Sequence, residues 1–304
     1  MPDLKTKNTS TDEVINYWLG KLRSGECLLS ETSPTSEDTL FIEDLWRLMD
    51  QVWDEMGCDN LDLNNDKISS YYQHPVWLLN GYFIENHDLS LQHRNAISDW
   101  IVKNNLLSVI DFGGGFGTLG RLITEKSDET IVDIYEPFPS QESLYRCQNH
   151  SRIKFVCQLN NQYDCLVCTD VLEHVPDPLS LLAQMVSSVN INGYLLIANH
   201  FYPCIKCHLP STFHFRYSFD QFAEVFGLQS IGICLNSHAT IYQKTVNQTP
   251  DWKLIRRMER ISQQLFFFRE FNRYYLLPWK NRIKNFITHP ITTVQKARAK
   301  FINF

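Results

Sequence analysis

Glycine is concentrated in one short segment of this chain. The sequence contains 12 glycines in 304 residues, which is below the roughly 7% usual in proteins. Five of the 12 fall within eight residues, at Gly113, Gly114, Gly115, Gly117 and Gly120. Because glycine adopts conformations that other residues avoid and lets a backbone approach a ligand closely, this cluster predicts a tight turn with a functional purpose.

The turn lies within a segment of alternating strand and helix patterns. Short apolar runs predict strands at 108–112, 130–135, 153–157, 163–169 and 193–199, and helical patterns lie near 117–126, 139–148, 178–189 and 218–226. This alternation predicts an α/β fold with a parallel sheet covered on both faces. Two further runs, at 228–235 and 238–244, predict an antiparallel β-hairpin. We therefore expect a mostly parallel seven-stranded sheet that ends in an antiparallel hairpin.

Three regions are expected along the chain. Residues 1–107 are predicted to form a helical cap that includes an acceptor-binding region. Within it, Thr35–Asp38 could cap a helix, and residues 91–103 form another helix before the first strand. Residues 108–246 form the core, and residues 247–304 form a basic helical extension. From Asp251 onward there are 12 basic and 3 acidic residues, and such a change in charge indicates a segment with a different partner.

The composition excludes several classes of protein. A hydrophobic content of 43% with 20% charged residues excludes a disordered chain. No apolar run approaches the roughly 18–20 residues that span a bilayer, and the polar N-terminus does not resemble a signal peptide. Nine cysteines without framework spacing indicate reduced thiols and a cytoplasmic location.

The glycine cluster has an acidic partner further along the chain. Glu136 ends the second predicted strand, 21 residues after Gly115, where a carboxylate can accept both hydroxyls of a ribose. The pair predicts a nucleoside ligand. Because Gly115, Gly117 and Gly120 match G-x-G-x-x-G, a nicotinamide-dependent dehydrogenase is one candidate.

Two motifs carry a resemblance to a known family. Asp111 precedes the glycines in a D-x-G-x-G-x-G pattern, which resembles motif I of class I S-adenosylmethionine (SAM) methyltransferases, including ubiquinone-biosynthesis and type 11 or 23 members. The segment from Tyr163 to Pro178, which contains LEHVPDP, resembles the family's fourth strand. The resemblance covers about residues 105–245 and implies a Rossmann-like fold and SAM as cofactor. A carboxylate at Asp111 suits the cationic end of SAM and would repel the pyrophosphate of a dinucleotide.

The resemblance also implies which residues bind SAM. They are expected to be Asp111, Gly113, Gly115, Gly117, Glu136, Gln158 and Asp170. Gln158 departs from the family pattern, since many relatives place an acid after the third strand to hold the adenine amino group. Either Gln158 or Asn160 could replace it by amide hydrogen bonding.

The segment after the fourth predicted strand carries candidate catalytic groups. Asp170, Glu173 and His174 are the expected catalytic residues, with His174 as general base for a hydroxyl acceptor. The alternative is that Glu173 and His174 only fix the loop. The pattern also resembles metal-dependent O-methyltransferases of ubiquinone biosynthesis and small RNAs. That resemblance implies Mg²⁺ or Mn²⁺ at Asp170, Glu173, His174 and His214, with His200 and His208 as rivals for the last position.

Aromatic and polar residues on both sides of the core predict the acceptor site. The expected acceptor-binding residues are Tyr72, His74, Tyr82, His214 and Arg216, which suit a polar acceptor such as a sugar. We therefore expect O-methylation of a sugar hydroxyl on a surface polysaccharide or a lipid-linked glycan. The open alternatives are a quinone-type small molecule, an RNA end, a dehydrogenase, and a non-catalytic nucleoside-binding scaffold.

The C-terminal extension has a pattern of its own. Trp252, Ile255, Met258, Ile261 and Leu265 recur at helical spacing, and arginines and aromatic residues accompany them. A basic, aromatic, amphipathic helix favours an anionic membrane surface, which predicts a peripheral location at its inner face. A helix packed on the acidic remainder of the chain is an equal alternative, and nucleic-acid binding is less favoured.

Overall fold

The computed structural model describes residues 17, 20 and 42–277. The chain divides into two compact units, residues 1–250 and 251–304, which are described separately below. The second unit begins close to the predicted boundary at 246/247, and the N-terminal helices belong to the same unit as the sheet. The predicted cap at Thr35–Asp38 and the chain beyond residue 277 lie outside the described residues.

The first unit is built on the predicted seven-stranded sheet. Its strands are β1 (Ser108–Phe112), β2 (Ile131–Tyr135), β3 (Ile153–Val156), β4 (Tyr163–Thr169), β5 (Val189–Ala198), β6 (Leu228–Ile233) and β7 (Thr240–Lys244). Their order is β3-β2-β1-β4-β5-β7-β6. The first five strands are parallel, and β7 pairs antiparallel with both β5 and β6. The expected Rossmann-like sheet with a terminal hairpin is confirmed.

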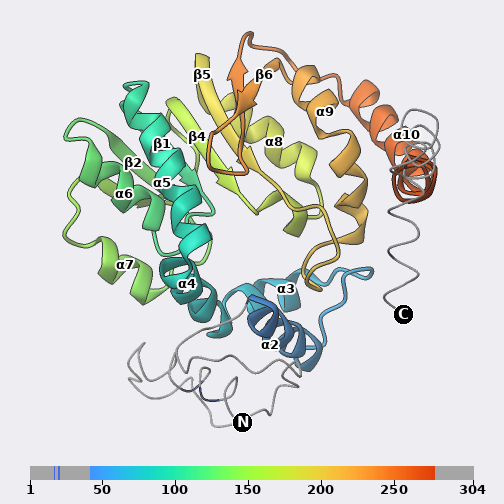
Figure 1. Ribbon diagram of the computed structural model, residues 1–304, viewed down its shortest axis with the longest axis horizontal. Coiled ribbons are helices and arrows are strands. Elements are labelled where there is room, and N and C mark those ends of the chain that lie inside the picture. The colour runs from blue at the N-terminus through green and yellow to red at the C-terminus, as the bar shows by residue number, and fades with distance from the viewer. Residues whose placement is uncertain (1–16, 18–19, 21–41, 278–304) are drawn as a thin grey trace, which may run out of the picture. The chain divides into compact units, whose positions relative to one another are not determined.

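Helices cover both faces of this sheet. They are α5 (Asp88–Lys103), α6 (Thr118–Lys126), α7 (Gln141–Cys147), α8 (Pro178–Ser187) and α9 (Phe219–Val225). Figure 1 shows α5 and α6 on one side of the strands and α8 and α9 on the other. Side chains alternate between the faces of a strand, so Val109 packs with Ile101 of α5 and Ile123 of α6 in one buried cluster. Because these strands are buried on both faces, they appear in the sequence as continuous apolar runs.

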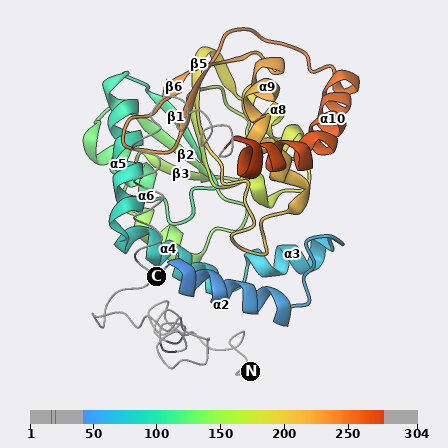
Figure 2. The same ribbon diagram turned by 45° about the vertical axis from the view of Figure 1, so that its right-hand side comes forward.

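The N-terminal helices form a second core together with the loop after β5. These helices are α2 (Ile42–Glu55), α3 (Asn65–Tyr72) and α4 (Val76–Asn86), and they lie together at one end of the unit in Figures 1 and 2. Their apolar side chains pack with Ile205 and Cys207 of the loop. Lys206 reinforces this contact, because its backbone N–H donates to Asp50 Oδ1 at 2.7 Å and its ammonium group pairs with Asp54.

Helix α4 also packs against the glycine-rich turn. A methyl group on Gly81 would lie 2.6 Å from the Phe116 ring, so only a residue without a side chain lets α4 approach this turn so closely. Next to this contact, the Glu85 carboxylate accepts a hydrogen bond from Thr118 Oγ1 at 2.9 Å and pairs with Arg121 and Arg146. The cap is thereby joined to the first helix after the turn.

The second unit begins with helix α10 (Trp252–Phe271), which one π-helical turn, Asn272–Leu276, follows. The Asp251 carboxylate caps α10 by accepting the backbone N–H groups of Lys253 and Leu254 at 3.0 and 3.1 Å, which satisfies donors that a helix start leaves unpaired. No helix within the described residues is long and apolar enough to cross a membrane.

Candidate functional site

The predicted functional residues gather at the carboxyl edge of the parallel strands. β1 lies between β2 and β4, and the chain turns toward one face of the sheet after β1 and toward the other after β4. This is the switch point at which ligands bind in open α/β sheets. Asp111 in β1, Glu136 after β2 and Asp170 after β4 therefore meet at one edge, as the order of strands in the sequence predicts.

The glycine-rich turn has the backbone conformation that glycine permits. Gly113, Gly115 and Gly117 have φ angles of +76°, +53° and +71°, in the left-handed region that other residues seldom adopt. The backbone N–H of Gly115 donates to Glu136 Oε2 at 3.1 Å. Partial burial raises the pKa of Glu136, and the N–H groups of Gly115 and Phe138 oppose that rise. The structure thus places this acid directly against the turn.

Asp111 lies beneath the same turn and is buried. A methyl group on Gly114 would lie 2.6 Å from Asp111 Oδ2, so the backbone passes directly over the carboxylate. Burial raises the pKa of Asp111 to about 7, against the opposing charge of Arg94. Arg94, which lies on α5 before the first strand, is a functional candidate that the sequence analysis missed. The only sequence signal was a basic residue within the helix that leads into β1.

Asp170 occupies a constrained position at the end of β4. Its φ angle is +55°, which is uncommon for a residue with a side chain and is typical of functional positions. Its carboxylate lies 3.6 Å from His238 Nε2, and His238 Nδ1 lies 2.8 Å from His93 Nδ1. Burial acts to raise the pKa of Asp170, but its side chain is 48% exposed. The hydrogen bond and the charge of His238 outweigh this effect and hold the pKa of Asp170 below its usual value.

His93 and His238 were also missed from the sequence. One lies on α5 and the other in the β6–β7 turn, and no motif links them. Only the fold brings these two segments together, with Cys234 Sγ hydrogen-bonded to the carbonyl oxygen of Ala96 at 3.6 Å.

A second cluster lies directly after Asp170. Single donor atoms of Glu173, His174 and His208 all lie within 4.8 Å of one another. Glu173 is fully buried. Its Oε1 accepts the backbone N–H of His200 at 2.6 Å, and its Oε2 has no hydrogen-bond partner among the described residues. Burial and the charge of Asp170 raise the pKa of Glu173 to about 8.

The two imidazoles of this cluster have the same tautomer. His174 Nδ1 lies 3.2 Å from the carbonyl oxygen of Cys207, and His208 Nδ1 lies 2.7 Å from that of Tyr202. Because a carbonyl oxygen only accepts, each Nδ1 carries the proton, and the lone pair of each ring is on Nε2. Burial and the neighbouring His208 lower the pKa of His174 to about 3, so this ring is neutral.

The structure brings together two members of the predicted metal-ligand set, Glu173 and His174, with the rival His208, and leaves Asp170 and His214 outside this group. Asp170 pairs with His238 instead of joining the cluster. His214 is buried in the 3₁₀-helix Pro210–Tyr217, with its ring centroid 4.0 Å from that of Phe215. His208 takes the expected place of His214 because the Leu209 N–H donates to the carbonyl oxygen of Glu173 at 2.9 Å. This bond draws the segment around His208 to Glu173.

One predicted acceptor residue lies at this cluster, and the others have different contacts. Tyr72 stands edge-on to His174 with 6.2 Å between the ring centroids, and Trp77 does so at 6.4 Å. His74 Nδ1 accepts the N–H of Val76 at the start of α4, and Tyr82 packs on the core of the cap. The Arg216 guanidinium stacks over Tyr202 at 4.2 Å.

Gln158 is exposed after β3, and its Oε1 accepts a hydrogen bond from Asn160 Nδ2 at 3.1 Å. The two amides that were proposed as alternatives for adenine recognition are therefore neighbours. Their role in ligand binding stays a prediction.

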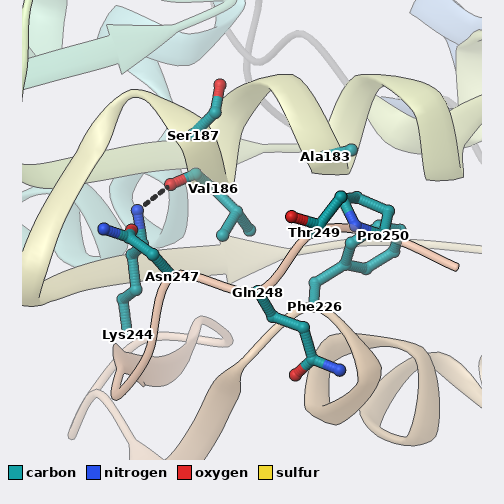
Figure 3. Close-up of a pocket in the computed structure, with 9 residues that line it drawn as sticks. All are labelled: Ala183, Val186, Ser187, Phe226, Lys244, Asn247, Gln248, Thr249 and Pro250. Atoms are coloured by element: carbon teal, nitrogen blue, oxygen red, sulfur yellow. Dashed lines mark hydrogen bonds between the residues drawn. The ribbon is translucent and has the colours of Figure 1, made fainter.

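A pocket at the opposite edge of the sheet is unrelated to these residues. It encloses about 210 Å³ between the C-terminal end of α8 and the segment 247–250. The ammonium group of buried Lys244 donates to the carbonyl oxygens of Val186 and Val189 at 2.8 and 2.7 Å, and Figure 3 shows the first of these bonds. A cation there satisfies carbonyl groups at the end of a helix, so we assign Lys244 a structural role.

Comparisons with known proteins place this chain among methyltransferases. A family model described as a methyltransferase domain matches residues 85–265. Ubiquinone biosynthesis O-methyltransferase of Photobacterium profundum is 24% identical over 131 residues, which cover 40% of this chain and 56% of that protein. The same enzyme of Nitrosomonas europaea is 24% identical over 153 residues, which cover 46% and 65%. This chain therefore spans between about half and two thirds of the length of these relatives.

Solved structures with some similarity to this chain include mitomycin 7-O-methyltransferase, with 14% identity and a TM-score of 0.42 over 79% of this chain and 73% of that chain. They also include the plantazolicin methyltransferase in complex with a substrate analogue and SAH, with 16% identity and a TM-score of 0.32 over 61% and 62%.

Proposed function

This chain belongs to the methyltransferase-domain family, and we propose that it transfers the methyl group of SAM to a hydroxyl group of its acceptor. One observation carries the proposal. At the switch point of the sheet, a left-handed glycine turn lies over buried Asp111 and against Glu136. A backbone that can touch a ligand, with a carboxylate for a ribose and a second for a cationic end, is complementary to SAM.

Each end of the cofactor has a partner in this proposal. Glu136 accepts the ribose hydroxyls, and the amides after β3 bind the adenine. Asp111 binds the ammonium group of the methionine end, and Arg94, whose charge lies near Asp111 and Asp170, pairs with its carboxylate. This pair of opposite charges matches an amino acid and is unfavourable for a dinucleotide, whose pyrophosphate carries only negative charge.

The cluster of Glu173, His174 and His208 fits a divalent cation. An unpartnered buried carboxylate oxygen and two Nε2 lone pairs form a donor set that proteins use for such ions. A bound cation would lower the pKa of an acceptor hydroxyl. A pKa of about 3 makes His174 a poor proton acceptor near neutral pH, so we favour its role as a ligand over that of general base.

The proton of the acceptor hydroxyl needs another route. Asp170 lies next to Val171, whose Cγ2 would lie 2.6 Å from a methyl group on Gly113, so Asp170 borders the glycine turn. We assign this proton to His238, which lies 3.6 Å from the Asp170 carboxylate and 2.8 Å from His93 Nδ1, because the ionised Asp170 stabilises the imidazolium that forms. Histidine has the ordinary pKa nearest neutrality and suits this role.

Two acceptor classes have support. A sugar hydroxyl of a polysaccharide or lipid-linked glycan is favoured by the aromatic side chains of Tyr72 and Trp77 at His174, since aromatic rings with polar tips suit sugars. A phenolic, quinone-type hydroxyl is the second candidate, because the curated relatives are named for ubiquinone biosynthesis.

Methyl transfer from SAM labelled in its methyl group tests both classes. The intact protein is incubated with a lipid-linked glycan extract from cells that lack the gene and, separately, with catechol-bearing polyprenyl compounds. We expect label and the mass of one CH₂ unit in the glycan, and neither with Glu136→Ala. Label found only in the catechol compound would make a quinone-type hydroxyl the acceptor in place of the sugar. Saturable SAM binding without methyl transfer to either compound would indicate a non-catalytic nucleoside-binding scaffold.

A further inference from the structure

Helix α10 and the π-helical turn that follows it carry an exposed apolar stripe. Leu254, Ile261, Leu265, Phe268 and Tyr275 are separated by seven, four, three and seven residues, which places them on one helix face. Each of these side chains is between 41% and 66% exposed. We call these five residues the α10 stripe. A regular stripe of this length differs from single exposed apolar residues, which are normal on protein surfaces.

Aromatic rings widen the stripe toward its C-terminal end. Phe267, Phe271 and Tyr274 are each more than half exposed, and Phe267 reaches 81%. Phe271 stacks on Tyr275 with 5.2 Å between the ring centroids. Such rings are favoured at membrane–water interfaces, where their faces contact lipid and polar edges contact water.

Basic side chains accompany the stripe on one flank. Lys253, Arg257 and Arg260 are exposed, and helical geometry places each of them within about a third of a turn of the stripe. Residues 252–277 contain six basic and two acidic residues, a net charge of +4. Long basic side chains can extend from an apolar face to bind anionic groups at the level of the interface.

We propose that α10 binds the surface of an anionic phospholipid bilayer and lies parallel to it, with the α10 stripe in the interface. Apolar, aromatic and basic residues on one exposed face form the combination that interfacial helices use. A second copy of this chain fits less well, because two stripes would bring two basic flanks together. RNA would pair with the arginines but would leave Leu254, Ile261 and Leu265 without apolar contacts.

Vesicle sedimentation with the full-length protein tests this proposal. The vesicles contain phosphatidylcholine alone or phosphatidylcholine with about 40% phosphatidylglycerol. We expect binding to the anionic vesicles and at least tenfold weaker binding to the neutral ones. The Phe267→Ser/Phe268→Ser variant should lose at least tenfold in affinity. The Arg257→Glu/Arg260→Glu variant should lose a similar factor, since each basic residue near an anionic surface contributes roughly fivefold.

A control variant and a second measurement make each outcome decisive. Gln184 is exposed on α8 in the first unit and has no part in the stripe, so Gln184→Ala should bind as the wild type does. Circular dichroism checks that each variant is folded. Equal binding to both vesicle types, or binding that both double variants retain, overturns the proposal. A dimer in sedimentation velocity that the Phe267→Ser/Phe268→Ser variant abolishes, without vesicle binding, assigns the stripe to a second copy. RNA binding without vesicle binding also overturns it.

Discussion

Replacing Asp111 by asparagine should stabilise the protein and weaken its binding of SAM. The Asp111 side chain is only 3% exposed, and burial raises its pKa to about 7 although Arg94 opposes the rise. Above pH 7 the folded protein therefore holds a buried negative charge. Asparagine keeps the size of the side chain and removes this charge, together with the attraction for the ammonium group of SAM.

The pKa values give the size of the effect and its dependence on pH. A carboxyl whose pKa rises on folding destabilises the folded state increasingly from pH 4 upward, and the effect levels off above pH 7. For a rise from 3.8 to about 7, the destabilisation is about 2 kcal/mol at pH 5 and about 4 kcal/mol at pH 8. The advantage of Asp111→Asn should therefore grow by roughly 2–3 kcal/mol between these two pH values.

Urea denaturation of wild type and variant at pH 5 and pH 8 measures this advantage. Titration calorimetry at pH 8 with S-adenosylhomocysteine (SAH), the demethylated product of SAM, measures the affinity, which should fall at least tenfold in the variant. The reasoning is refuted if the stability advantage is the same at both pH values, or if asparagine stabilises the protein without changing the affinity for SAH.

Three further variants test other parts of the account. Gly81→Ala places a methyl group 2.6 Å from the Phe116 ring and should lower the free energy of unfolding by about 1–3 kcal/mol. An unchanged urea midpoint would show that α4 does not pack closely against the glycine-rich turn. Glu173→Gln should abolish the activation of EDTA-treated protein by Mn²⁺ in the methyl-transfer assay, whereas activity that survives EDTA in the wild type would exclude the metal. His238→Asn should lower kcat about tenfold or more with KM unchanged, and a kcat equal to that of the wild type would remove His238 from the proton route.

The fold was predictable because its signals are local. β1 and β4 were located to the residue by their apolar runs, since strands buried on both faces need apolar side chains throughout. β5 begins at Val189, four residues before the predicted start, because Val189 pairs with Tyr163 ahead of a register shift. The hairpin was also predicted, and its turn residue Asn236 has a φ angle of +63°.

The site was only partly predictable because its remaining contacts depend on the fold. Glu136 and Asp111 follow strands in a known order, so the sequence alone places them at the glycine turn. Arg94 and His93 reach the site from a helix outside any motif. The choice among three histidines after β5 depends on one backbone hydrogen bond, from Leu209 to Glu173, which residue spacing does not reveal.

Titration calorimetry of the intact protein with SAH and, separately, with NAD⁺ tests the central claim most directly. That claim is that the glycine turn, Asp111 and Glu136 form a site for SAM. The account predicts saturable binding of one SAH per chain, weakened at least tenfold by Glu136→Ala, and no saturable heat with NAD⁺. Saturable binding of NAD⁺ together with no binding of SAH would contradict it.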